Sequence, residues 1–394
     1  MATSKVTNLS ILDDAVRTAG IQDAAVTAAK TSGVPTLFRP NAKPLIINGD
    51  MAVAQRGTSA TGQTATGYYV CDRWNLAISS SGTWTISQDT DVPSGYGFLT
   101  STKYDCTTAD GSLGASDYIL HKQSIEGQNL QLLKKGTANA EKVTISFWVK
   151  ATKTGTNILE LYDNTNNRQV SQSYTISSTD TWQKVVLNFP ADTTGALANN
   201  NGGALNVQFY LGAGSNFTSG TLQETWAGYV NANRAVGQVN HADSTSNDFW
   251  ITAIQLEVGE YTSSTLPPFQ HESYGDNLAR CQRYFQVIAK KESGDNEDAV
   301  LPFDAYSGST IYGVYNFKTE MRASPSLSCA SGTDYFRWFS ENTYTDFDTF
   351  VLDKSSPQTC DLYQSVSATQ GSGGWVRMIN NAPDGSLVAL NGEL

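Results

Sequence analysis

The chain has 394 residues, 39% of them hydrophobic, and a formal net charge of −11 at pH 7. This length suits two or three domains, and the apolar content is high enough for packed cores, which excludes a disordered chain. An acidic surface without a basic stripe repels phosphate, so we expect no nucleic-acid partner. No apolar run approaches about 18 residues, so we expect no membrane insertion. The N-terminus lacks the basic start and apolar run of a secretory signal, so we expect cytoplasmic synthesis without a signal peptide.

Residues 1–40 differ in pattern from the rest of the chain. Two successive ten-residue segments repeat, and the large aliphatic residues that both segments share recur at every fifth position. So thin a stripe cannot bury itself in one chain, but it can pack against copies of itself around an axis. The sequence therefore predicts an N-terminal arm and linker that makes the protein a homotrimer. The aligned apolar residues expected at the trimer axis are Ile11, Val16, Ile21 and Val26. A disordered arm or a short surface helix is the alternative.

Residues 41–275 contain segments that alternate between apolar and polar residues. Clear examples are "KVTISFWVKA" (142–151) and "ALNVQFYLGAG" (204–214), and "TWQKVVLNF" and "NDFWITAIQLEVG" are similar. A period of two, with turn-rich connections and no helical period between the segments, predicts an antiparallel β-sandwich of the jelly-roll type.

Residues 276–394 are expected to form a smaller C-terminal β-domain. The segment 276–291 begins at a Gly-Asp cap and has apolar residues at helical spacing, so it predicts a helix. It can equally begin as a helix and continue as a strand at "YFQVIAK". The expected fold class is therefore mainly β, with the N-terminal arm, the jelly-roll sandwich and this smaller domain in chain order.

No enzymatic signature is evident, and we expect a protein that is not an enzyme. The five cysteines lack metal-ligand spacing, and His121, His241 and His271 are scattered. His271 and Glu272 are neighbours, and adjacent residues on a strand point to opposite faces, which makes a poor acid–base pair. Paired carboxylates for glycoside cleavage need only meet in space, so that alternative stays open.

The strands between residues 45 and 260 resemble those of jelly-roll carbohydrate-binding modules. The resemblance is carried by "LIINGDM", "KVTISFWVKA", "TWQKVVLNF" and "FWITAIQLEVG". Such modules often hold a structural calcium that joins the first and last strands, and Asp50 and Glu257 could supply oxygen ligands for it. The alternative is that residues 48–50 form a simple turn. We expect no other cofactor.

The stretch between residues 255 and 285 is similar to a junction found in virion structural proteins of marine podoviruses and their relatives. The shared residues are "QLEVG", "PF", "SYG" and "CQRY", with departures at His271, Asn277 and Phe285. The resemblance implies a virion protein and favours a tail fibre that is exposed on the particle and attached to other virion proteins through the N-terminal arm. The alternatives are a head fibre or capsid-decorating protein, a glycan depolymerase tailspike, and an architectural fibre without a receptor.

A fibre of this kind would bind host-surface carbohydrate through aromatic rings and polar side chains, since sugars have apolar C–H faces and polar hydroxyls. Two sets of residues are candidates for this contact. The first is one sheet face carrying Trp148, Lys150, Gln208 and Tyr210; the second, which we favour, is the C-terminal set Tyr335, Trp338, Tyr344, Asp346 and Asp348. The alternative for both sets is that the aromatic residues fill a core or a subunit interface.

The charged segment between residues 267 and 286 is expected to be a domain junction. The residues assigned to it are Pro268, Phe269, Tyr274, Arg280, Arg283 and Tyr284. The prolines fix an extended exit from the sandwich, and the arginines pair with Glu272, Asp276 or a neighbouring subunit. Tyr274, Tyr284 and Phe285 are expected to pack in the seam.

Overall fold

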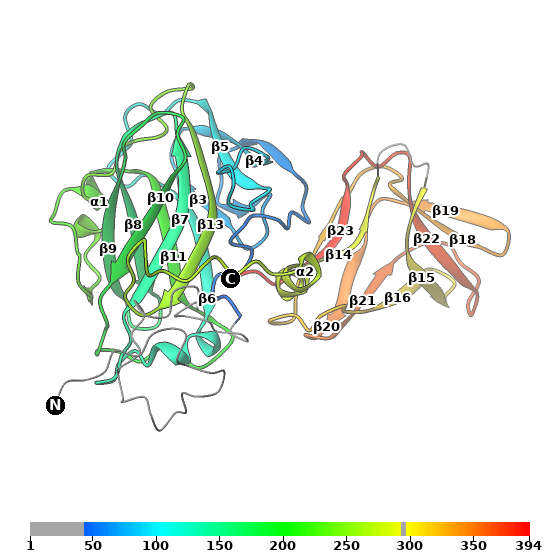
Figure 1. Cartoon of the computed structure of the whole chain (residues 1–394). Helices are drawn as coiled ribbons and strands as arrows, with labels where there is room; N and C mark the ends of the chain where they lie inside the picture. The colour runs from blue at the N-terminus through cyan, green and yellow to red at the C-terminus, as the bar shows by residue number, and fades with distance from the viewer. Residues whose placement is uncertain (1–42, 293–296) are drawn as a thin grey trace, which may run out of the picture. The chain divides into compact units, whose positions relative to one another are not determined.

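The structure, a computed structural model, describes residues 43–292 and 297–394 (Figure 1). The residues predicted to form the trimer axis, Ile11, Val16, Ile21 and Val26, lie outside the described residues, as does the whole segment 1–40. In the described part of the chain the strands pair antiparallel throughout, so the expectation of a mainly β protein is confirmed. No helix among the described residues is long and apolar enough to cross a membrane.

The sandwich consists of two sheets. The six-stranded sheet has the order β1-β4-β5-β13-β7-β10, and the seven-stranded sheet has the order β12-β9-β8-β11-β6-β3-β2 (Figure 1). The strands of the first sheet are β1 (Ser59–Gln63), β4 (Thr83–Asp89), β5 (Ser101–Thr108), β13 (Asp248–Val258), β7 (Val143–Ala151) and β10 (Gln183–Phe189). Those of the second are β12 (Ala227–Gly228), β9 (Arg168–Ile176), β8 (Gly155–Asp163), β11 (Gly203–Ala213), β6 (Tyr118–Glu126), β3 (Asn75–Ser79) and β2 (Gly67–Tyr68). Short helical turns occur in the connections: η4 (Gly127–Asn129), η5 (Gln131–Leu133), α1 (Ser215–Thr218) and η6 (Asn231–Asn233).

The core lies between the two sheets. Phe147 of β7 and Phe209 of β11 are both fully buried, and their rings meet edge to face at 4.9 Å. His121 of β6 belongs to this core, where its ring stacks on Trp74 at 4.3 Å. Burial lowers the pKa of His121 to about 3, so the ring is neutral. Alternate residues of β6, β7 and β11 therefore point to the outer faces of the sandwich.

The C-terminal part has its own core and two sheets. The three-stranded sheet has the order β14-β23-β17, and the seven-stranded sheet has the order β19-β18-β22-β15-β16-β21-β20. Their strands are β14 (Phe285–Lys290), β15 (Glu297–Ser307), β16 (Thr310–Asn316), β17 (Ser326–Cys329), β18 (Phe336–Ser340), β19 (Thr343–Phe347), β20 (Val351–Ser355), β21 (Thr359–Gln364), β22 (Gly373–Ile379) and β23 (Leu387–Asn391). The helix α2 (Tyr274–Gln282) precedes β14, so the segment begins as a helix and continues as a strand. The Ser273 hydroxyl accepts from the Asp276 amide and caps α2.

The junction residues divide into those that pack and those that do not. Tyr284 is buried, and its hydroxyl donates to Glu126 at 2.6 Å. Arg280 pairs with Glu272 as expected, whereas Arg283 pairs with Glu126 of the sandwich at 2.7 Å instead of with Glu272 or Asp276. Tyr274 is 61% exposed, so the expectation that it packs in the seam is wrong. It occupies the first position of α2, on the side that faces solvent.

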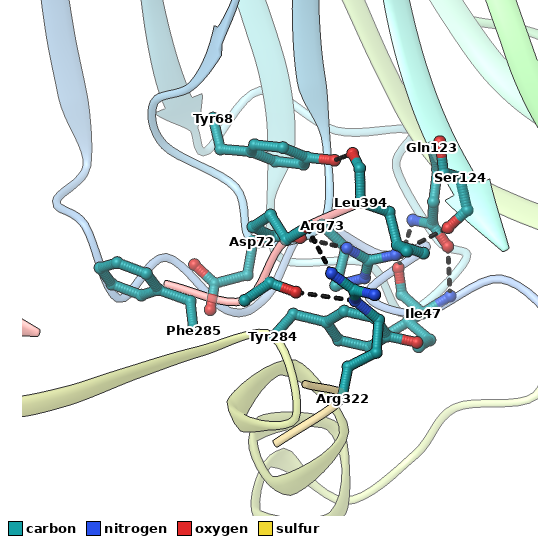
Figure 2. Close-up of polar contacts among 12 residues, drawn as sticks. Ile47, Tyr68, Asp72, Arg73, Gln123, Ser124, Tyr284, Phe285, Arg322 and Leu394 are labelled. Carbon is teal, nitrogen blue, oxygen red and sulfur yellow. Dashed lines mark hydrogen bonds and ion pairs between the residues drawn. The ribbon is translucent and has the colours of Figure 1, made fainter. Parts of the chain in front are cut away.

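The sandwich also holds the end of the sequence (Figure 2). The Arg73 guanidinium lies 3.4 Å from the ring centroid of Tyr284 and donates to the Ser124 carbonyl at 2.7 Å. Arg73 also forms an ion pair with Glu393, and the Tyr68 hydroxyl donates to the main-chain oxygen of Leu394 at 2.7 Å. These buried contacts connect β6, the link between α2 and β14, and the residues after β23.

Candidate functional site

The outer face of the seven-stranded sheet carries rows of side chains fixed by strand register. Asn75 of β3, Lys122 of β6, Gln208 of β11 and Glu160 of β8 are direct cross-strand neighbours. Two residues further along the same strands lies a second row, in which Ala77 of β3 pairs with Leu120 of β6 and Leu120 pairs with Tyr210 of β11. A polar row therefore runs beside an apolar row on the same face.

A groove of about 290 Å³ opens over these rows, and we call it the β6–β11 groove. Phe217 of α1 and the segment 229–234 form its wall, and this segment is fastened to the sheet by the hydrogen bond from Gln169 Nε2 to the Val230 carbonyl at 3.1 Å. The groove's polar groups come from Tyr118, Lys122, Gln208, Tyr229, Asn231 and Arg234.

Glu160 organises the base of the groove. Its carboxylate is fully buried and accepts from Arg234 Nη2 at 2.7 Å, Gln208 Nε2 at 2.9 Å and the Tyr210 hydroxyl at 3.2 Å. Burial opposes the charge of Arg234, but the Glu160 carboxylate outweighs it and raises the pKa of the guanidinium. This network fixes the side chains of Arg234, Gln208 and Tyr210 before any ligand binds.

Lys122 differs from the other cation of the groove. Its side chain is half-buried, and among the described residues no hydrogen bond or ion pair reaches its ammonium group. Burial, followed by the charge of Arg234, lowers the pKa of Lys122. Of the two cations in the groove, Arg234 is paired with a carboxylate, whereas Lys122 has no anionic partner among the described residues.

Two tyrosines give the groove partly exposed aromatic surface. Tyr118 packs edge-on against Phe217 at 5.9 Å, and Tyr229 packs edge-on against Tyr162 at 5.5 Å, so both rings are held in place. An aromatic face accepts the C–H face of a sugar ring, and amide and ammonium groups hydrogen-bond its hydroxyls. The groove therefore has the donor types and the volume for a sugar unit.

The first predicted contact set does not lie on one face. Gln208 and Tyr210 line the β6–β11 groove, although both are buried and hydrogen-bonded to Glu160. Trp148 and Lys150 belong to β7 and face outward from the other sheet. The prediction of one shared face was wrong, because alternation identifies outward positions but does not say to which sheet a strand belongs.

Trp148 lines a second hollow, of about 270 Å³, on the outer face of the six-stranded sheet. Tyr96 packs on the Trp148 ring at 4.5 Å, and Phe269 and His271 of the junction close one side. His271 packs against Phe269 at 5.0 Å, and Glu272 is bound to Arg280, so these neighbours do not form an acid–base pair.

Lys150, beside this hollow, has an acidic partner. It pairs with Asp91, and its ammonium lies 3.9 Å from the ring centroid of Trp250. Trp182 Nε1 donates to the same carboxylate at 2.8 Å. The pKa of Asp91 is lowered, because the hydrogen bonds from Lys150 and Trp182 outweigh its partial desolvation. The polar groups at this point are therefore already paired within the protein.

The C-terminal set is also divided by the structure. Trp338 is only 3% exposed and lies in the core, so its prediction as a surface contact was wrong. Tyr335 is half-buried against that core, Asp346 pairs with Arg337 at 2.6 Å, and Asp348 accepts from the Asp334 amide at 3.0 Å.

Tyr344 is 60% exposed, and the outward row on which it lies includes Phe339, an aromatic residue of the same segment, and Trp375, which was absent from the predicted set. Phe339 is its cross-strand partner, and Trp375 stacks on Phe339 at 5.9 Å and is 51% exposed. Trp375 occupies an outward position in "GWVRMI", so alternation could have identified it.

Asp50 and Glu257, the predicted calcium ligands, line one small cavity together with Glu272. Asp50 accepts from Asn277 Nδ2 at 3.2 Å, and Glu272 is engaged by Arg280. Among the described residues, no three or more His, Cys, Asp or Glu side chains are grouped so that they could hold a metal ion. Calcium also takes main-chain carbonyl oxygens as ligands, so the calcium site at Asp50 and Glu257 stays a prediction.

Several groove residues had not been singled out from the sequence. Tyr118 and Lys122 occupy outward positions of β6, but the segment 118–126 has no strict apolar–polar alternation from which this could have been inferred. Tyr229 and Arg234 lie in an irregular segment, and only the folded chain brings them to the sheet.

No protein-family model and no curated protein is significantly similar to the chain. Among solved structures, the bacteriophage CBA120 tailspike protein 4 enzymatically active domain is 14% identical, covering 55% of this chain and 21% of that chain with a TM-score of 0.27. The family 11 carbohydrate-binding module from Clostridium thermocellum, in complex with a β-1,3-1,4-mixed-linked tetrasaccharide, is 11% identical, covering 52% of this chain and 98% of that chain with a TM-score of 0.26. TmCBM61 in complex with β-1,4-galactotriose is 9% identical, covering 55% and 99% of the two chains with a TM-score of 0.29. At TM-scores this low, the likeness adds nothing to what the strand pairing already shows.

Proposed function

We propose that this chain is a bacteriophage virion fibre that adheres, without catalysis, to a glycan on the host cell surface. The observation that carries the adhesion is the β6–β11 groove, which Tyr118 and Tyr229 line together with Lys122. The virion role is supported by the resemblance of residues 255–285 to the junction of podovirus-type virion proteins.

The proposed assembly is a homotrimer joined through residues 1–40, which also attach the fibre to other virion proteins. Three copies on one particle multiply a weak sugar affinity, because the second and third contacts are intramolecular. Light scattering should give a trimer mass for the full chain and a monomer mass after deletion of residues 1–40. A monomer mass for both would contradict the trimer.

The adhesion is tested with purified host-surface polysaccharide and the full chain. Tyr229→Ala should weaken binding about tenfold, since it removes a fixed aromatic face, and Tyr118→Ala should act in the same direction. Tyr306→Ala is the matched control, because Tyr306 is 73% exposed on β15, outside the groove. Equal losses for Tyr229→Ala and Tyr306→Ala would rule out the groove as the binding site.

The same experiment separates adhesion from the alternative of a depolymerase tailspike. An adhesin leaves the polysaccharide intact, whereas a depolymerase releases reducing ends. Measuring reducing ends over the time of the binding assay decides between these functions. Release that persists in Tyr229→Ala would contradict the proposal and would indicate a catalytic site elsewhere.

A further inference from the structure

The charges around the β6–β11 groove do not balance. Among the residues that the structure describes, its lining contains Lys122 and Arg234 but no Asp or Glu, in a chain whose net charge is −11. Glu160 lies beneath the groove, and both of its oxygens are within hydrogen-bonding distance of the Arg234 guanidinium, at 2.7 and 2.9 Å. This ion pair uses the available anion and leaves the charge of Lys122 uncompensated.

The position of Lys122 makes this imbalance costly. Its neighbours in register, Asn75 and Gln208, are neutral, and the nearby Arg234 repels it. Other lysines withdrawn from solvent in the sandwich have acidic partners: Lys135 lies 2.8 Å from Asp192, and Lys103 lies 3.0 Å from Asp248. A half-buried ammonium without an anion has lost hydration that no protein group replaces.

We propose that the β6–β11 groove binds an acidic sugar, whose anionic group pairs with Lys122 while Tyr118 or Tyr229 contacts the ring. The inference rests on the proposed glycan adhesion and adds the class of sugar. The recognised chemistry is an anion on the sugar ring, either the carboxylate of a uronic acid or a sulfate ester. A ligand anion at this point replaces the lost hydration of Lys122 with a charge-assisted hydrogen bond.

The test measures binding of the full chain to acidic polysaccharides and to their uncharged derivatives. The probes are alginate, polygalacturonate and hyaluronan, each with its carboxyl-reduced form, and a sulfated galactan with its desulfated form. We expect at least one acidic polymer to bind roughly tenfold or more tightly than its uncharged form, which is the contribution of one charge-assisted hydrogen bond. A response to carboxyl reduction identifies a uronate, and a response to desulfation identifies a sulfate.

Two variants assign the effect to its residue. Lys122→Gln should bind the acidic polymer and its uncharged form equally, because the amide keeps a donor without the charge. Lys184→Gln is the matched control, since Lys184 is an exposed lysine on the outer face of the other sheet, and it should keep the wild-type preference. Thermal unfolding of both variants shows whether the fold is intact.

The outcomes distinguish this inference from the function on which it rests. Binding to neutral polymers that Tyr229→Ala abolishes, without preference for acidic ones, would overturn the acidic-sugar assignment and keep the adhesion. A preference that survives Lys122→Gln would overturn the role of Lys122. Failure to bind host polysaccharide and every polymer of the panel would overturn the adhesion itself.

Discussion

The two outer faces of the sandwich differ in how far their polar groups are already engaged. The outer face of the six-stranded sheet presents more tryptophan, but acidic residues of the protein already accept hydrogen bonds from these groups. Trp250 Nε1 donates to Asp89 at 3.1 Å, and Asp91 accepts from Trp182 and pairs with Lys150. Among the described residues, the outer face of the seven-stranded sheet presents tyrosines and Lys122, a half-buried cation without an anionic partner.

This difference teaches that residue type alone is a weak guide to a binding surface. Tryptophan and lysine on a strand suggest sugar recognition, yet an indole has a single N–H donor and must give up its carboxylate partner before that donor can bind a ligand, and a lysine paired with a carboxylate has no uncompensated charge for an anion. Glu160 shows the other arrangement, in which a buried anion fixes Arg234 at the groove wall. Three predictions sharpen the comparison, in order of decreasing effect.

Glu160→Gln should cause the largest loss of stability. The substitution leaves the Arg234 guanidinium largely buried without its anion, and breaking a buried pair in this way costs about 3–5 kcal/mol. Urea unfolding followed by tryptophan fluorescence measures the change in free energy of unfolding. Asp91→Asn is the matched control on the other face, where the carboxylate is 44% exposed and the pair contributes about 1 kcal/mol or less. Equal losses for the two variants would remove the distinction between the faces.

Mild acid should destabilise the interior between the two faces. Burial lowers the pKa of His121 and of His241 to about 3, whereas in the unfolded chain histidine titrates near 6.5. The unfolded state therefore binds more protons than the folded state. The contribution of the two histidines to the free energy of unfolding is complete above pH 6.5 and is lost as pH falls below that value. Burial raises the pKa of Asp72 to about 6, so its proton uptake in the folded state offsets one histidine between about pH 6 and 4.

The net excess in that interval is about one proton, which corresponds to about 1.4 kcal/mol lost per pH unit. Unfolding free energies measured at pH 6, 5.5 and 5 give the slope. His121→Phe removes one titrating group and should flatten the slope by about one proton. An unchanged slope in that variant would show that His121 does not carry the effect.

The sequence was sufficient to predict the strands and their outward positions, but not to predict where the site lies. Alternation predicted the strands that contain Trp148 and Gln208 and identified both as outward positions, because a period of two follows directly from strand geometry. Their separation onto different sheets is set by pairings between residues far apart in the chain, such as Val207 with Leu161. Local sequence carries no signal for such pairings.

The C-terminal set shows the same limit in another form. Trp338 and Tyr344 lie on paired strands, and both are aromatic residues in a polar segment, yet one is in the core and the other is exposed. Alternation within "YFRWFS" places Phe336 and Trp338 on one face and Phe339 on the other, but only the second layer decides which face is buried. The groove residues Tyr229 and Arg234 lie outside any periodic segment, so the pattern did not locate them.

Trp148→Ala should have the smallest effect and tests the comparison most directly. If the β6–β11 groove binds the glycan, removing the Trp148 ring from the opposite face should change the affinity for host polysaccharide by less than about twofold, because a change of 0.4 kcal/mol or less is typical of a residue outside a contact. Binding titrations of Trp148→Ala and Tyr229→Ala under identical conditions make the comparison. A large loss in Trp148→Ala with Tyr229→Ala unaffected would move the site to the hollow of about 270 Å³ beside Tyr96 and Phe269. In that case the internal pairing of Lys150 with Asp91 would be a way of orienting Trp250 and Trp182 next to the sugar, and the unpaired charge of Lys122 would need another partner.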